Sequence, residues 1–247
     1  MSSHLDSRPG VLARRWAARG WSLIDTLLGL SLGLVVLGLA GHAFLQSREA
    51  WQQLQAQLAL LHQIQLVATR LSHDWPLTQG FDWGTWSQSP QGLGDVTPNV
   101  AAGRGKSGDW LELSYPSAAR ARDCQDNLSV GRLVRNRYQR NDKKELTCRD
   151  TLGVATTAQA LVEGVEDFRV WLLVRERADA WRWWAAGELP AQQRVVAIRI
   201  CLRVASKQAV PAPSMALRGC LGETVRADRL WRRLWWQTWV LPAGGLS

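Results

Sequence analysis

An acidic residue at the start of a long apolar run is the first feature of this sequence that could do chemistry. Asp25 precedes residues 26–45, which carry no formal charge and consist mostly of Leu, Val, Gly and Ala. A carboxylate inside a bilayer costs about 2.5–3.5 kcal/mol on insertion scales, so it needs a partner or a role there. The other interpretation is structural, because a carboxylate in the first turn of a helix is favoured by the helix dipole.

Gly20 lies between a basic segment and this apolar run. The basic segment contains Arg8, Arg14, Arg15 and Arg19. A secretory signal peptide carries its small-residue cleavage site after the apolar core, whereas here the small residue comes before it. Cleavage after Gly20 would therefore remove the charges and leave the apolar helix on the mature chain. The positive-inside rule keeps the Arg-rich segment in the cytoplasm and predicts that the rest of the chain lies outside.

Four cysteines follow the apolar run, at Cys124, Cys148, Cys201 and Cys220. They form no C-x-x-C pair and have no neighbouring His, so we predict no metal site and no cofactor. Sequential pairing is the simplest of the three possible disulfide patterns, and each loop of about 20 residues would contribute roughly 3 kcal/mol. Disulfides require an oxidising compartment such as the periplasm. Four buried free thiols in a reducing cytosol are the alternative.

A long helix must position these residues. An apolar run of about 20 residues spans the roughly 30 Å hydrocarbon core of a bilayer. Apolar residues then recur at steps of three or four, which is helical periodicity: Trp51, Leu54, Leu58, Leu61, Ile64, Val67, Leu71 and Trp75. We expect this stripe to be core, with Arg70 and Asp74 on the opposite face, and Pro76 to end the helix. The prediction is one helix over residues 21–75, with a transmembrane half at 21–45.

The remainder, residues 76–247, is predicted to form a periplasmic or extracellular α+β domain. Residues 76–108 contain Pro and Gly without periodicity and are expected to be a long loop. Alternating segments predict strands near 110–115, 133–138, 168–174, 196–204 and 234–240. Because no helical segments separate them, we expect an antiparallel sheet, with the long helix packed on it.

Two groups of segments resemble known proteins. Residues 20–25, Gly-Trp-Ser-Leu-Ile-Asp, resemble the type IV prepilin processing motif. The strand at 109–115, then Cys124, Cys148 and the Leu-Val-Glu-Gly-Val-Glu-Asp-Phe-Arg-Val segment at 161–170, resemble the PilW family of minor pilins. Gly164 in that segment is expected at a tight turn before a strand, as a folding signature rather than a site.

The resemblance implies that residues 1–20 are a prepilin leader and that prepilin peptidase cleaves after Gly20 and methylates Trp21. The family usually has Phe at that position and Glu where this chain has Asp25. It also implies that Asp25 pairs with the N-terminal ammonium of a neighbouring subunit during filament assembly.

The predicted function is therefore a minor pilin that takes part in initiating or capping type IV pilus assembly. Its expected partners are prepilin peptidase, other minor pilins, the major pilin and the inner membrane. It would first be a single-pass inner-membrane protein with a periplasmic C-terminal domain, and later part of the pilus at the cell surface. A minor pseudopilin of a type II secretion system is the alternative.

Other classes of function have weaker signals. The chain has 247 residues and a formal charge of +9, which fits a solvated basic surface but could also favour nucleic acid. Segments 181–184 and 231–239 interleave Trp with Arg, a pattern that can stack bases and contact phosphates. Packed Trp in a buried or edge strand is the structural alternative.

No G-x-S-x-G or H-E-x-x-H motif is present. Glu163, Glu166 and Asp167 cluster, but we expect solvated charge there and predict no catalytic residue.

Overall fold

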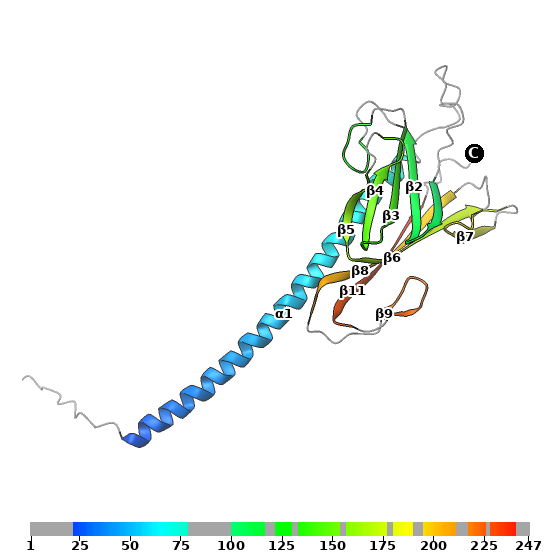
Figure 1. The fold of residues 1–247 in the computed structure, drawn as a ribbon. Coiled ribbons are helices and arrows are strands. Elements are labelled where there is room, and N and C mark those ends of the chain that lie inside the picture. The colour runs from blue at the N-terminus through cyan, green and yellow to red at the C-terminus, as the bar shows by residue number, and fades with distance from the viewer. Residues whose placement is uncertain are drawn as a thin grey trace, which may run out of the picture. The chain divides into compact units, whose positions relative to one another are not determined.

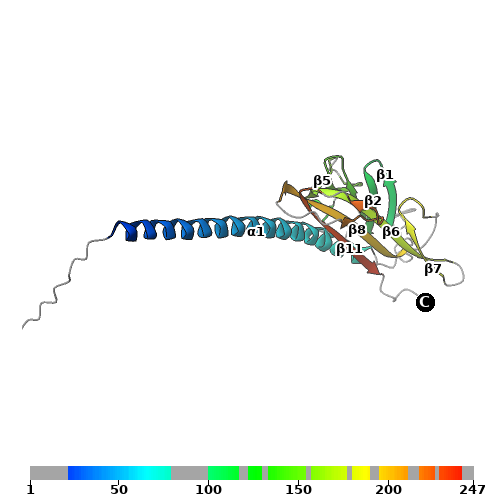
Figure 2. The ribbon, with the colours of Figure 1, turned by 90° about the horizontal axis from the view of Figure 1, so that it is seen from below.

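The structure is a computed structural model that describes residues 22–78, 100–116, 122–129, 133–153, 157–176, 180–189, 195–210, 217–225 and 228–240. Gly20, Trp21, the leader at 1–20 and the loop residues 79–99 lie outside these ranges. The chain comprises two compact units, Met1–Arg48 and Glu49–Ser247. The described residues form one helix and eleven strands (Figures 1 and 2).

Helix α1 runs without interruption from Leu23 to Leu77, close to the predicted span of 21–75. Pro76 lies inside its last turn instead of ending the helix one residue earlier. The preceding residue, Trp75, is buried in the core, and packing there outweighs the bias of a pre-proline residue against helix. The amide and the hydroxyl of Thr78 both donate to the Trp75 carbonyl and close the helix end.

A five-stranded antiparallel sheet follows the chain in order, β1-β2-β3-β4-β5. Its strands are β1 Val100–Gly105, β2 Gly108–Pro116, β3 Leu133–Arg140, β4 Glu145–Asp150 and β5 Gln159–Glu163. The strands predicted at 110–115 and 133–138 are confirmed as parts of β2 and β3. Strands β4 and β5 were not predicted, because their short apolar alternation is broken by polar residues.

The predicted loop at 76–108 is wrong at its C-terminal end, because β1 and the start of β2 form a hairpin there. Gly103 is one reason why this strand was not predicted from the sequence. A Cβ at Gly103 would come within 2.4 Å of the Trp110 ring, so the glycine leaves room for Trp110 to lie across β1. Two of the glycines that suggested a loop, Gly103 and Gly105, are therefore part of an edge strand.

A second antiparallel sheet has the order β11-β8-β6-β7. Its strands are β6 Val165–Arg175, β7 Trp181–Ala185, β8 Val195–Ala209 and β11 Leu230–Val240. The predicted strands at 168–174, 196–204 and 234–240 are confirmed, and β7 was missed. A two-stranded ribbon of β9 (Leu217–Arg218) and β10 (Thr224–Val225) completes the domain. The α+β class is confirmed, although the strands form more than the one expected sheet.

One core joins α1 to both sheets. The helix contributes Leu60, Ile64, Val67, Leu71 and Trp75. The sheets contribute alternating inward residues such as Leu111 and Leu113 from β2 and Ile198 and Ile200 from β8, all fully buried. The amphipathic pattern therefore correctly predicts the core face of α1 from Ile64 onward, whereas Leu60, which it did not include, is buried and Leu61, which it did include, is exposed.

Two disulfides fix loops to this core, and they have the sequential pairing. Cys124–Cys148 ties the segment before β3 to β4, and Cys201–Cys220 ties β8 to the turn between β9 and β10. Their Cα–Cα distances are 6.1 and 5.8 Å, within the usual range for disulfides. No free cysteine remains.

Candidate functional site

Ser22 caps the start of α1. Its hydroxyl oxygen accepts a hydrogen bond from the Ile24 amide at 3.3 Å, and its carbonyl accepts one from the Asp25 amide at 2.9 Å. Asp25 thus lies in the first helical turn, where a carboxylate faces the positive end of the helix dipole. This geometry agrees with the structural interpretation, in which the helix dipole favours Asp25. A pairing role in assembly needs a second chain and stays a prediction.

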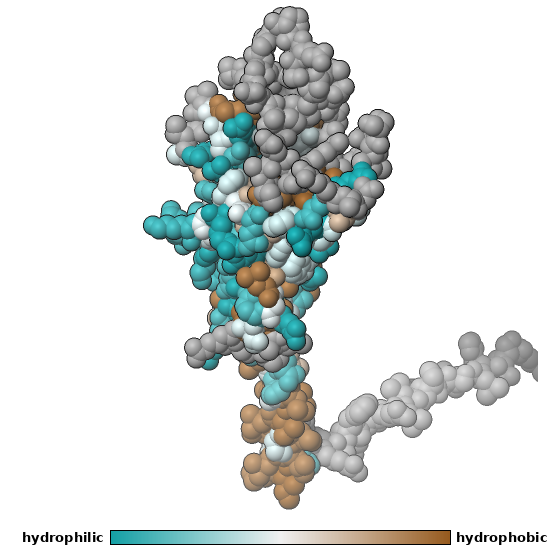
Figure 3. Space-filling model, turned by 90° about the vertical axis from the view of Figure 1, so that its right-hand side faces the viewer, coloured by the Kyte–Doolittle hydropathy of each residue, from teal (hydrophilic) through white to brown (hydrophobic). Residues whose placement is uncertain are grey.

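The helix beyond Asp25 presents an apolar surface on all sides. Every residue from 23 to 45 is exposed, including Leu23, Leu37 and Leu39. By length and composition α1 could cross a membrane. Figure 3 shows the start of the helix as a continuous apolar surface. A helix that is apolar all round is stable only when lipid or protein covers it, so this surface is the first candidate functional feature.

The glycines of this segment leave open space around the helix. A Cβ at Gly29 or Gly33 would meet no other atom within 4 Å. The two glycines are four residues apart and therefore lie on one face, where a small-xxx-small pattern permits close helix contact. Whether another helix uses that face stays a prediction.

An exposed apolar stripe continues into the second unit. Trp51, Leu54, Leu58 and Leu61 are 61%, 44%, 55% and 39% exposed. The expectation that they belong to the core is wrong, because the buried face of α1 runs through Leu60 and Ile64, and these four residues lie to one side of that face. They recur at steps of three and four, so they share one helical face. Exposed apolar patches of this kind mark interaction surfaces.

A buried carboxylate docks the end of α1 on the five-stranded sheet. Asp74 is fully buried, although the sequence placed it on the polar face of the helix. One of its oxygens accepts hydrogen bonds from the Tyr138 hydroxyl at 2.5 Å and the Asn136 amide at 2.6 Å. The same Asn136 amide also lies 3.0 Å from the Tyr115 hydroxyl. The sequence signal was the alternation of β3, which puts Asn136 and Tyr138 on the same inward face as Val134.

The environment of this network changes the acidity of its tyrosines. Burial, together with the nearby Asp74 charge, raises the pKa of Tyr138 well above its ordinary value. Burial also raises the pKa of Tyr115, with Asp74 again adding to the effect. Both hydroxyls therefore remain protonated donors at physiological pH.

Arg70 extends the network to the first disulfide. Its guanidinium donates to the Asp123 carbonyl and pairs with Asp126 at 3.3 Å. The Cys124 amide donates to the Asn136 side-chain oxygen at 3.1 Å. The segment 122–129 is thus held by a helix, a strand and a disulfide. No pattern in the sequence predicts its contact with Arg70.

The sequence matches a protein-family model over part of its length. Residues 128–238 match the family model of type IV pilus-assembly protein W. The resemblance to this family is confirmed over that range, which is slightly less than half of the chain. The match supports a role in type IV pilus assembly. No curated protein matches the sequence.

One solved structure similar to this chain is a type IV-like pilin from Thermus thermophilus. The two share 17% sequence identity, and the comparison covers 68% of this chain and 95% of that chain with a TM-score of 0.38.

The segment 161–170, which carried the resemblance, lies inside the matched range and spans the β5–β6 turn. Gly164 has a φ of 74°, and a Cβ there would come within 2.4 Å of the Ala205 carbonyl oxygen. Its own carbonyl accepts a hydrogen bond from the Ala205 amide at 2.8 Å. Gly164 is therefore needed for a turn and a close backbone approach, although the turn joins two strands instead of a loop and a strand.

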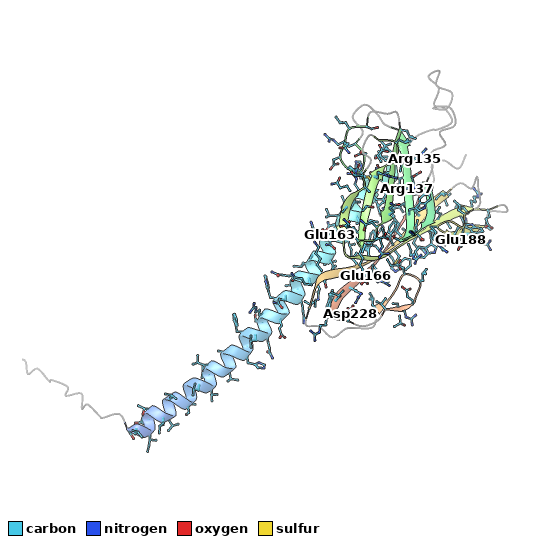
Figure 4. The ribbon with its side chains drawn as sticks, in the orientation of Figure 1. Arg135, Arg137, Glu163, Glu166, Glu188 and Asp228 are labelled. Carbon is cyan, nitrogen blue, oxygen red and sulfur yellow. A yellow bond between two sulfur atoms is a disulfide. The ribbon has the colours of Figure 1, made fainter. Side chains whose placement is uncertain are left out.

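The acidic residues of this segment have different environments. Glu163 is exposed and pairs with Lys207. Glu166 is only 12% exposed and forms ion pairs with Arg203 and Arg232, so solvated charge describes Glu163 but not Glu166 (Figure 4). Within the described ranges, no group of three or more His, Cys, Asp or Glu residues could hold a metal ion.

The Trp-rich strand β11 divides its side chains between two faces. Trp231, Trp235 and Trp239 pack against the core. Trp236 lies on the opposite face and stacks on Trp171 with ring centroids 5.2 Å apart. All four Trp rings of β11 thus have a packing contact, as the structural alternative predicted, although Trp236 is still 43% exposed. Nucleic-acid binding by the remaining face stays a hypothesis.

Proposed function

We propose that this chain is a minor pilin that takes part in initiating or capping type IV pilus assembly. The observation that carries the proposal is the fully exposed, uncharged helical surface over residues 26–45. The same helix contributes its other end to the core of an α+β domain. The family match over residues 128–238 supports the assignment to a pilus and favours it over a pseudopilin of a type II secretion system.

In this proposal prepilin peptidase cleaves after Gly20 and methylates Trp21. The apolar half of α1 first holds the chain in the inner membrane, with the Arg-rich leader in the cytoplasm. The domain then faces the periplasm, an oxidising compartment, where the two disulfides are stable. Extraction from the membrane exchanges lipid contacts of the apolar helix for contacts with the helices of the major pilin and other minor pilins.

Asp25 is proposed to be the assembly carboxylate. In lipid it would be costly, so pairing with the N-terminal ammonium of a neighbouring subunit favours transfer from the membrane to the filament. The exposed stripe at Trp51, Leu54, Leu58 and Leu61 extends the apolar contact surface beyond the membrane-spanning part.

N-terminal sequencing and mass measurement of the membrane-fraction protein test the processing step. We expect a mature start at methylated Trp21 in cells that contain prepilin peptidase, and an intact leader in cells that lack it. A chain that retains Met1 in both strains would refute the assignment.

An Asp25→Ala variant tests the assembly step. We expect normal insertion into the membrane and reduced recovery in sheared pili. Asp25→Glu, which keeps the carboxylate, should be incorporated, as should Glu49→Gln, which removes an acid beyond the apolar run. Equal incorporation of Asp25→Ala and the wild type would contradict the proposed role.

A further inference from the structure

A charged pocket with no residue of α1 in its lining lies where β8 and β11 meet the β3–β4 turn. Its volume is about 310 Å³. Its charged lining consists of four cations and two carboxylates: Arg140, Lys144, Glu166, Arg203, Asp228 and Arg232. The sequence did not single out this group, because its members come from segments far apart in the chain.

Both carboxylates of the lining are already bound by arginines. Arg232 contacts Glu166 through two nitrogens at 2.7 and 3.0 Å, and it contacts Asp228 at 2.5 and 2.7 Å. Arg203 adds a pair to Glu166 at 3.3 Å. Hydrogen bonds from Arg232 lower the pKa of Asp228 to about 2, so this carboxylate stays ionised at neutral pH. Glu166 and Asp228 are therefore engaged in holding Arg232.

The other two cations have no carboxylate within 4 Å in the described part of the chain. Arg140 donates to two backbone carbonyls, those of Val165 at 2.9 Å and Ser107 at 2.8 Å. These bonds fix the guanidinium without neutralising it. Within the described residues Lys144 forms no side-chain hydrogen bond and no ion pair within 4 Å, although its charge interacts at longer range with that of Asp228. Its backbone carbonyl accepts from the Val165 amide at 2.7 Å.

The charge balance of the pocket is positive. Four cations and two carboxylates leave a formal charge of +2 on the lining. Glu223, which pairs with Arg203 at 2.9 Å just outside the lining, reduces the local sum to +1. An anion that enters would thus be attracted by Arg140 and Lys144 without having to displace an existing ion pair.

The positions of these cations are set by rigid backbone. Lys144 has a φ of 60° at the β3–β4 turn, and the Asn141 side chain accepts from the Lys143 and Glu145 amides on either side. The adjacent Gly164 turn is fixed by its close approach to Ala205. The Arg140 guanidinium, held by two carbonyls, is therefore a preorganised donor that loses little conformational entropy when a ligand binds, whereas the exposed Lys144 side chain is fixed only at its backbone.

We propose that this pocket is a binding site for an anionic group of carboxylate or phosphate chemistry. The ligand would lie against Arg140 and Lys144 and be oriented by the fixed guanidinium. The source is either a free small anion or an acidic segment of another protein. The proposal does not depend on cleavage after Gly20 or on the role of Asp25.

Equilibrium dialysis of labelled inorganic phosphate against the detergent-solubilised full chain tests the first source. Fluorescence anisotropy of a labelled acidic peptide, at the same ionic strength, tests the second. Lys144→Gln is the informative variant, because Lys144 lines the pocket without holding the fold. Lys143→Gln is the matched control, since it removes the same charge one residue away.

We expect at least one of the two probes to bind about fivefold more weakly to Lys144→Gln, the effect of one partly exposed charge, and unchanged binding to Lys143→Gln. Weaker phosphate binding by Lys144→Gln shows that a free anion is a sufficient ligand. Weaker binding of the peptide alone shows that the ligand is a carboxylate carried by another protein. Equal binding by Lys144→Gln and the wild type for both probes would overturn the site. An equal loss in Lys143→Gln would also overturn it, because it would reveal only general surface charge.

Discussion

Asp74→Ala is expected to destabilise the domain strongly, although the residue lies on a helix face that the sequence marks as polar. The substitution leaves the Tyr138 hydroxyl and the Asn136 amide without their acceptor, in a site that solvent does not reach. A buried polar group that loses its partner costs about 1–3 kcal/mol. Two such groups give a loss of about 3 kcal/mol in the free energy of unfolding, beyond the lost van der Waals contacts.

The assay is denaturant unfolding of the detergent-solubilised full chain, with both disulfides intact and Trp fluorescence as the probe. Asp126→Asn is the control. Asp126 binds the same Arg70, but its side chain is 76% exposed, so the loss of its charge should cost less than about 1 kcal/mol. Asn also tolerates the positive φ of 64° at this position, so the backbone is not strained. Asp74→Asn, which preserves the shape, should fall between Asp74→Ala and this control. If Asp74→Ala is no more destabilising than Asp126→Asn, the buried network does not dock the helix.

Two further predictions concern pH and backbone conformation. Tyr115 and Tyr138 are the only tyrosines of the chain, and both have raised pKa values. Because the unfolded chain ionises tyrosine at about pH 10 and the folded chain only at higher pH, their contribution to stability is complete below about pH 10 and declines above it. Tyrosinate absorbance should therefore appear near pH 10 in denaturant and only at higher pH in the native protein; identical titrations would exclude the network. Gly164→Ala should cost about 2 kcal/mol or more, from positive φ and the clash with Ala205. Gly222→Ala has a similar φ of 83° but open space around the Cβ, so it should cost less; equal losses would show that the Ala205 contact is unimportant.

The sequence by itself determined the features that depend on local periodicity. The uncharged run after Asp25 and the three-to-four spacing beyond it predict a single long helix, since both patterns act within a few turns. Strict alternation predicts β8 for the same reason, because Ile198, Ile200 and Leu202 all point inward from one strand. The position of Gly20 between the basic segment and the apolar run predicts cleavage of the leader and the orientation of the chain in the membrane. Both depend on the local sequence and not on the fold of the domain.

Only the tertiary structure decided which of the side chains in these patterns are buried. The apolar residues of α1 recur at steps of three or four from Trp51 to Trp75, yet the first four of them are exposed and the later ones are core. A helix turns by about 100° per residue, so these steps let the apolar face drift around the axis, and Trp51 and Leu61 lie to one side of the buried face that contains Leu60. Asp74 can be buried because the Asn136 amide and the Tyr138 hydroxyl of β3 donate hydrogen bonds to its carboxylate. Such pairings join residues more than 60 positions apart, and no local pattern can specify them.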